Sequence, residues 1–228
     1  MIWILFIGTM ALSLWAAWRV KSVYARYNQG SVRAGVTGAE VATEILRRKG
    51  IRDVEITVGE GMLGDHYDPL QKRLVLSPDN FHGRTPAALG VAAHECGHAI
   101  QHALAYKPLH WRMAAVGITT YANYVVMFLP LLGLFTGIIQ PLTGALIMAV
   151  AWGVIMLFNL VTLPVEFDAS RRAKAVLADF GFIAPGEEAT GVRKVLDAAA
   201  LTYVAAFITS LAYFLWHLLP LLMGQRRN

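Results

Sequence analysis

A long run without charged residues dominates the second half of the chain. Residues 113–165 contain no Asp, Glu, Lys or Arg, and Gln140-Pro141 interrupts the run near its middle. About 20 apolar residues are enough for a helix to cross a bilayer. The run therefore predicts two antiparallel transmembrane helices, roughly 114–139 and 142–163, joined by a tight turn.

Two further apolar runs, residues 2–18 and 198–223, raise the expected number of crossings to four. The first run has no basic residue ahead of it and no clear A-x-A site before Arg19, which favours a retained anchor over a cleaved signal peptide. The composition agrees, since 56% of residues are hydrophobic and 15% are charged, against about 25% charged in soluble domains. A single cysteine, Cys96, excludes a disulfide scaffold.

The basic residues set the expected orientation. Segment 19–112 carries 13 Lys and Arg, segment 164–197 carries five, and the C-terminal tail carries two. By the positive-inside rule, the two large segments face the cytoplasm and both chain ends lie outside. The sequence predicts a multi-pass cell-membrane protein with its polar portions on the cytoplasmic side.

This pattern predicts a mainly α integral membrane protein with a small cytoplasmic α+β part. The predicted parts are an N-terminal transmembrane helix (1–18), a cytoplasmic α+β portion (19–112), a transmembrane hairpin (113–163), a cytoplasmic helical segment (164–197) and a C-terminal transmembrane helix with its tail (198–228).

The polar portion begins with short elements. Thr37-Gly-Ala-Glu40 is a capping-box pattern that opens a helix, and Gly50 ends it. Residues 54–58 alternate apolar and polar side chains, as a strand does, and Leu74-Val75-Leu76 is a second candidate strand. The turn-forming residues between them suggest a hairpin with a long polar tip, residues 59–73, which could leave a site open or cover it.

The next helix carries the candidate chemistry. Thr85-Pro86 predicts its start and Lys107-Pro108 its end. It contains His94-Glu95-Cys96-Gly97-His98, an H-E-x-x-H motif. Histidines four residues apart share one helical face, so both imidazoles can bind one zinc ion, and Glu95 can act as general base. Cys96 lies about 200° around the helix from His94 and is expected to be a small buried core residue.

Catalytic zinc normally has a third protein ligand. His102 is about 12 Å along the helix from His94, too far for one ion to bind both, so it is expected to support a ligand or lie at the surface. After the transmembrane hairpin the chain offers Glu166 and Asp168. Asp168 can pair with Arg171 and Arg172, whereas Glu166 shares a face with small residues. Glu166 is the preferred ligand over Asp168, and Asp179 and Asp197 are the least favoured candidates.

Several blocks of the sequence resemble the YugP-type membrane neutral zinc metallopeptidases of bacteria. The matching blocks are Thr37-Gly-Ala-Glu-Val-Ala42, Asp65-His-Tyr-Asp-Pro69, Leu76-Ser77, Ala92-Ala-His-Glu-Cys-Gly-His-Ala-Ile-Gln-His102, Leu163-Pro-Val-Glu-Phe-Asp-Ala-Ser170 and Val195-Leu-Asp-Ala-Ala-Ala-Leu-Thr-Tyr-Val204. The resemblance implies a zincin-like α+β part in a membrane protease, with one zinc per chain bound by His94, His98 and Glu166. The layout is also similar to the membrane gluzincins, which often have Asp four residues after the ligand glutamate. Here that residue is Ser170, so Asp197 or His102 could take the supporting role.

The expected reaction is hydrolysis of a peptide bond in a membrane or membrane-proximal protein, with Glu95 moving the proton. The oxyanion needs a further donor, for which the candidates are His66, Tyr67, Tyr106 and His110. An extended substrate could add to the strand around Val54–Val58, or to the hairpin edge near Met62. The expected partners are peptide or membrane-protein substrates and the lipid bilayer, with an oligomer or a regulatory membrane partner left open and no nucleic acid. No residue identifies the substrate.

Two other interpretations remain. A non-catalytic membrane scaffold or transporter subunit could use the histidines for a structural or sensing metal. An intramembrane protease would need the histidine pair inside an apolar crossing, and residues 79–112 contain too many polar residues for that. The interfacial zinc protease therefore ranks first.

Overall fold

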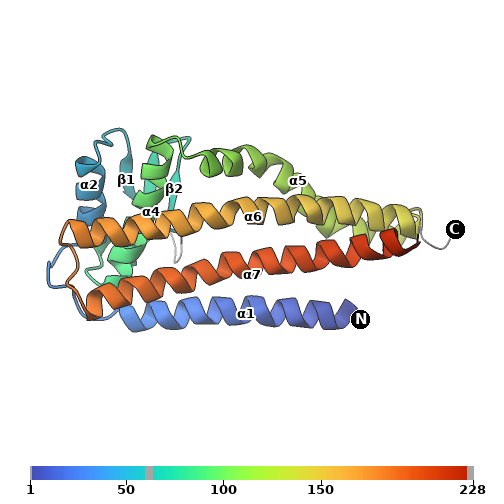
Figure 1. Cartoon of the computed structure of the whole chain (residues 1–228), viewed down its shortest axis with the longest axis horizontal. Helices are drawn as coiled ribbons and strands as arrows, with labels where there is room; N and C mark the ends of the chain where they lie inside the picture. Colours follow the sequence, from blue (N-terminus) through green and yellow to red (C-terminus); the bar gives the residue numbers. More distant parts are fainter. Residues whose placement is uncertain (1, 60–63, 225–228) are drawn as a thin grey trace. The chain divides into compact units, whose positions relative to one another are not determined.

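A computed structural model describes residues 2–59 and 64–224 of the chain. The elements, in chain order (Figure 1), are α1 (Ile2–Tyr27), α2 (Gly38–Arg48), β1 (Glu55–Val58), β2 (His66–Asp68), β3 (Arg73–Leu76), α3 (Pro78–His82), α4 (Pro86–Ala103), α5 (Lys107–Thr136), α6 (Pro141–Asp179) and α7 (Glu187–Gly224). The mainly α fold with a small sheet is confirmed.

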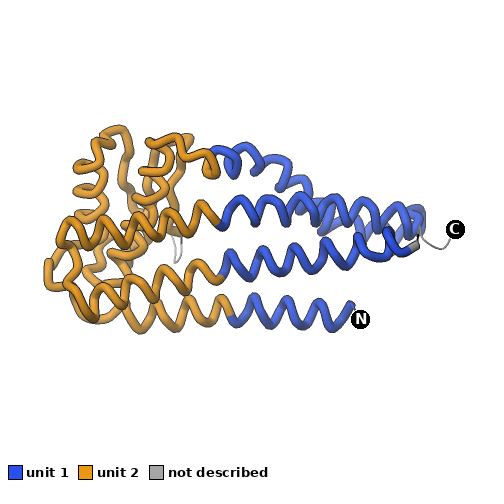
Figure 2. The backbone as a smooth tube through the Cα atoms, viewed as in Figure 1, with its two compact units in different colours: residues 1–15, 110–163, 202–228 blue, residues 16–109, 164–201 orange. Residues whose placement is uncertain are grey.

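The chain forms two compact units (Figure 2). The first, which we call the helical unit, contains residues 1–15, 110–163 and 202–228. The second, the site unit, contains residues 16–109 and 164–201. Helices α1, α5, α6 and α7 contribute residues to both units.

The helical unit consists of parts of α1, α5, α6 and α7, and each of these four helices is long and apolar enough to cross a membrane. Many of their large apolar side chains are exposed, as expected of surfaces that face lipid. Asn159 of α6 donates to the hydroxyl of Ser210 (3.0 Å) and the carbonyl of Ala206 (3.2 Å) on α7. This polar contact joins two of the candidate spans.

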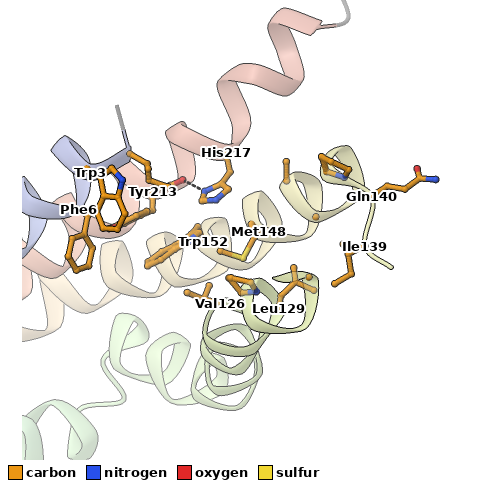
Figure 3. Close-up of a pocket in the computed structure, with 16 residues that line it drawn as sticks. Trp3, Phe6, Val126, Leu129, Ile139, Gln140, Met148, Trp152, Tyr213 and His217 are labelled. Atoms are coloured by element: carbon orange, nitrogen blue, oxygen red, sulfur yellow. Dashed lines mark hydrogen bonds between the residues drawn. The ribbon is translucent and has the colours of Figure 1, made fainter. Parts of the chain in front are cut away.

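The helical unit also contains an open, apolar pocket of about 890 Å³. Trp152 and Tyr213 stack in its wall, with ring centroids 4.6 Å apart. His217 donates from Nδ1 to the backbone carbonyl of Tyr213 at 2.8 Å (Figure 3). None of the residues lining this pocket is among the predicted catalytic or metal-binding residues.

The site unit contains a three-stranded sheet of order β1-β3-β2. β1 pairs parallel with β3, and β2 pairs antiparallel with β3. Residues 55–58 and 73–76 are strands as predicted, but the hairpin between them is wrong, because the antiparallel partner of β3 is the intervening β2. This strand has only three residues, two of them charged or polar, so its sequence looks like a turn. Met62, in the predicted tip, lies outside the described residues.

The core of the site unit forms where α2, α4 and β3 meet segments of α6 and α7. Its largest fully buried apolar side chains are Val41, Ile45, Leu74, Leu76, Leu89, Leu177 and Val192. The predicted capping box opens α2, since the Thr37 side chain accepts from the Glu40 N–H and the Glu40 carboxylate accepts from the Thr37 N–H. α2 in turn packs against α4, which fixes one side of the helix that carries the H-E-x-x-H motif.

Two helix boundaries differ from the predictions. α4 ends at Ala103, and Lys107-Pro108 begins α5, because proline is tolerated in the first turn of a helix as well as after its end. α6 continues through Pro164 to Asp179, so Glu166 lies within a long helix rather than at the start of a new one. A proline inside a helix removes one backbone donor and crowds the carbonyl four residues earlier, and long membrane helices tolerate it where the freed carbonyl finds another partner.

Candidate metal centre

α4 presents both histidines of the motif on one face. Thr85 caps the helix by accepting from the Ala88 N–H (3.1 Å), and Pro86 occupies its first turn. The imidazole rings of His94 and His98 are 4.8 Å apart between centroids. The opposite face is buried in the core, where Cys96 lies fully enclosed, as predicted. Burial raises the pKa of the Cys96 thiol, as does the charge of Glu95, so the sulfur is no thiolate ligand at neutral pH.

α6 brings Glu166 to these two histidines. Its Oε2 atom lies 3.3 Å from Nε2 of His94 and 3.7 Å from Nε2 of His98. Candidate ligand atoms of the three residues all lie within 4.8 Å of one another, and the Glu166 side chain is 2% exposed. The structure therefore brings together the three residues that were predicted as ligands. Glu166 lies 72 residues after His94 and 68 residues after His98 in the chain.

A glycine permits this approach of the two helices. A Cβ atom on Gly97 would lie 2.7 Å from the carbonyl oxygen of Ala169 and 3.0 Å from its Cα. Both contacts are with the backbone of α6, which cannot move aside as a flexible side chain can. The small-residue face predicted next to Glu166 thus meets a glycine located between the two histidines.

Gly97→Ala is expected to separate α4 from α6 and weaken metal binding, at a cost of about 1–3 kcal/mol in folding stability for the overpacking. Thermal unfolding of the metal-free protein and a zinc titration would measure the two effects. Gly117→Ala in α5 is the matched control, since a Cβ there meets nothing within 4 Å. Unchanged zinc affinity in Gly97→Ala would contradict this role for the glycine.

The outer nitrogen of each imidazole also has a partner. Nδ1 of His94 lies 3.1 Å from the Ser170 hydroxyl, and Nδ1 of His98 lies 3.0 Å from Oε1 of Gln101. Such contacts orient metal-binding histidines and leave Nε2 for the metal. Ser170 thus makes the supporting contact to a ligand histidine for which Asp197 or His102 was considered. Asp197 instead pairs with Lys174. Gln101 was not predicted as a site residue, although its position three residues after His98 on the same helix was a usable signal.

Two carboxylates act on the pKa of His98. Burial favours the neutral ring and would lower the pKa, but the contact with the Glu166 carboxylate and the negative charges of Glu95 and Glu166 outweigh it. The pKa of His98 is therefore raised above its ordinary value. The centre attracts positive charge, as a cation site must.

Asp168, the alternative ligand, is engaged elsewhere. It forms the predicted ion pairs with Arg171 and Arg172. The carboxylate is nevertheless buried rather than at the surface, and it also accepts from the Gln101 amide at 2.9 Å. Asp179, the other candidate on α6, is exposed.

The predicted oxyanion donors lie in different places. The Tyr67 hydroxyl is 2.9 Å from Nδ1 of His102, which joins β2 to α4. His66 is exposed and contacts the Gly64 carbonyl at 2.7 Å. The Arg172 guanidinium lies over the ring of Tyr106, with its Cζ atom 5.9 Å from the ring centroid. His110 belongs to the helical unit. The structure thus keeps Tyr67 and His102 together and does not gather all the candidates.

The ligand atoms that His94, His98 and Glu166 offer are of the types that bind zinc. Two imidazole nitrogens and one carboxylate oxygen are the ligands of one class of catalytic zinc sites, which keep a further position for water. A carboxylate as buried as Glu166 is costly without a partner of positive charge, and the two imidazoles alone supply that charge only when protonated. A bound dication satisfies all three groups at once.

Comparison with known proteins places these observations in a family. The chain is 40% identical over 222 residues to "Putative membrane protease YugP" of Bacillus subtilis strain 168, covering 97% of each chain. No solved structure matches the chain significantly. The family model described as "Putative neutral zinc metallopeptidase" matches residues 2–223. The chain therefore belongs to the family described as "Putative neutral zinc metallopeptidase".

Proposed function

We propose that this protein is a zinc-dependent endopeptidase that cuts membrane or membrane-proximal proteins at the cytoplasmic face of the cell membrane. The observation that carries the proposal is the convergence of His94, His98 and Glu166 ligand atoms within 4.8 Å, with Glu95 next to the first of them. Family membership supports zinc proteolysis in general. The role of each residue follows from the geometry and from the chemistry of peptide hydrolysis.

Zinc, when held by these three residues, supplies a Lewis acid that polarises a substrate carbonyl and makes water more acidic. Glu95 accepts the proton of the attacking water and then donates it to the leaving amine. Its side chain is largely buried, and its negative charge helps to raise the pKa of His98. Ser170 and Gln101 hold the two imidazoles in orientation.

Tyr67 is the strongest of the candidate oxyanion donors. Burial, together with the charges of Asp53 and Asp68, raises the pKa of Tyr67 to about 12. The phenol keeps its proton at neutral pH, and that proton is available to an oxyanion when Nδ1 of His102 donates to the Tyr67 oxygen. Its contact with His102 fixes it one helical turn beyond His98.

The same strand is the best-supported place for an extended substrate. β2 lies at an edge of the sheet and contacts α4, whereas β1 lies at the opposite edge and contacts α2. Addition of a substrate strand to β2 would bring a peptide carbonyl toward the helix that carries His94 and Glu95. This favours β2 over the Val54–Val58 strand as the substrate edge.

Chelation of the purified, detergent-solubilised protein tests the function directly. We expect about one zinc per chain and hydrolysis of a quenched fluorescent peptide library. A zinc chelator should remove the metal and abolish hydrolysis, and adding zinc should restore hydrolysis. Hydrolysis that survives complete removal of the metal would exclude the proposed chemistry.

Single-cysteine labelling tests the cytoplasmic orientation. Cys96 is buried, so an impermeant maleimide should leave the parent chain unlabelled. Arg52→Cys, in the polar portion, is expected to react only in inverted vesicles, while Ile138→Cys, between α5 and α6, is expected to react in right-side-out vesicles. The reverse pattern would place the site on the outer face.

A further inference from the structure

We propose that Gln101 is a positioning residue that selects the metal-binding tautomer of His98 and holds α4 and α6 in register. The proposal rests on the proposed zinc site. Gln101 lies one turn after His98 on α4, and its side chain is fully buried. Three hydrogen bonds determine how its amide is oriented.

The amide nitrogen of Gln101 has two acceptors on α6. Nε2 donates to the backbone carbonyl of Val165 at 2.8 Å and to Oδ2 of Asp168 at 2.9 Å. Neither a carbonyl nor a carboxylate can donate, so both N–H groups of the amide are used by α6. The oxygen Oε1 is thereby directed to Nδ1 of His98, at 3.0 Å.

This orientation determines the state of His98. A carbonyl oxygen only accepts, so Nδ1 of His98 must carry the hydrogen. In a neutral imidazole the other nitrogen, Nε2, then has a free lone pair. Nε2 is the atom that faces Glu166, so the selected tautomer is the one that can bind a metal there.

Ser170 cannot impose the same choice on His94. Its hydroxyl can either donate to or accept from Nδ1, and rotates to suit the ring. The Gln101 amide has no such freedom, because its nitrogen is committed to Val165 and Asp168. Gln101 is therefore the more restrictive of the two supporting contacts.

Gln101 also links the ligands on the two helices. Val165 precedes Glu166 in α6, and Asp168 is held by Arg171 and Arg172. One buried side chain thus connects the His98 ring to the backbone next to the Glu166 ligand. Loss of Gln101 should loosen both ligands, although neither is itself changed.

The first test is Gln101→Leu, measured by zinc affinity in the full-length protein. Loss of such a supporting contact typically lowers metal affinity about 10- to 100-fold. The visible spectrum of the Co²⁺-substituted protein, which reports ligand geometry, is expected to change as well. The matched control is Asn80→Leu, which removes another buried amide that contacts Asp65 and Tyr24 and no ligand. Asn80→Leu should lower thermal stability and leave the zinc affinity of the folded protein unchanged.

A second test combines Gln101→Glu with Asp168→Asn, and it separates the positioning role of Gln101 from its packing. It does not depend on whether Gln101→Leu folds. Gln101→Glu keeps the shape and an acceptor for His98, but sets a carboxylate against Asp168 and the Val165 carbonyl, so it should weaken zinc binding. Adding Asp168→Asn supplies an amide donor to the new carboxylate and should restore part of the lost affinity, although the Val165 carbonyl still faces a carboxylate oxygen. The two changes should therefore be strongly non-additive.

The outcomes distinguish this proposal from the function on which it rests. If the parent protein binds zinc but Gln101→Leu and Gln101→Glu bind it equally well, the positioning role is wrong and the zinc site stands. A loss in Gln101→Glu that Asp168→Asn fails to restore also overturns the proposal. If the parent protein itself binds no zinc, the proposed function is the part that fails.

Discussion

Glu95→Gln is expected to lower peptide hydrolysis by about 10²- to 10⁴-fold while zinc stays bound. The amide has nearly the shape of the carboxylate and fits the same largely buried position, but it cannot accept a proton from water. Glu95 is not one of the three converging ligands, so the metal content should not change. Turnover of a fluorescent peptide and elemental zinc analysis of the same sample measure both quantities.

Glu55→Gln is the matched control for this experiment, because Glu55 is an exposed residue of β1. It should leave both turnover and zinc unchanged. Hydrolysis at the parental rate in Glu95→Gln would assign the proton transfer to another group. The variant also separates a protease from a metal-binding scaffold, since a scaffold would keep its cellular function without this carboxylate.

Glu166→Ala is expected to release the zinc and, with it, all activity. The substitution leaves only the two imidazoles as protein ligands, and it removes the buried negative charge that faces them. The loss of zinc affinity should exceed the roughly 10- to 100-fold typical of losing a residue that merely supports a ligand. Isothermal titration with zinc, in detergent, gives the affinity directly.

Asp179→Ala provides the control on the same helix, because it removes an exposed carboxylate from α6. Zinc affinity there should equal that of the parent. Retention of stoichiometric zinc in Glu166→Ala would refute the assignment of the third ligand. Together, Glu95→Gln and Glu166→Ala separate the residue that moves a proton from the residue that holds the ion.

Local patterns predicted much of the fold. The capping box of Thr37 and Glu40 and the helix start at Thr85-Pro86 are formed as expected, because these signals act within one or two helical turns. The alternation in residues 55–58 correctly predicted a strand. The pairing of that strand was wrong, because strand partners depend on β2, which is too short and too polar to be recognised.

The candidate site was predictable to a similar degree. Helical spacing alone places His94 and His98 on one face, and the two predicted crossings would return Glu166 to the same side of a membrane. Spacing could not show that Asp168 is buried against Gln101, because both residues also fit a solvated helix surface. The close contact of Gly97 with Ala169 likewise appears only when the two helices are packed.

The sequence by itself determined which segments are apolar enough to cross a membrane, which helix carries the paired imidazoles, and which carboxylates could complete the site. These features follow from residue type and from periodicity along one element. Tertiary structure alone decided the strand order, the choice between Ser170 and more distant partners for His94, and the orientation of the Gln101 amide. The strand order depends on how β1, β2 and β3 pair, and the two side-chain contacts depend on α4 packing against α6. The residues of α4 and α6 that meet there are 64 and 76 positions apart in the chain, and the distance between them is set by how closely side chains and backbones pack.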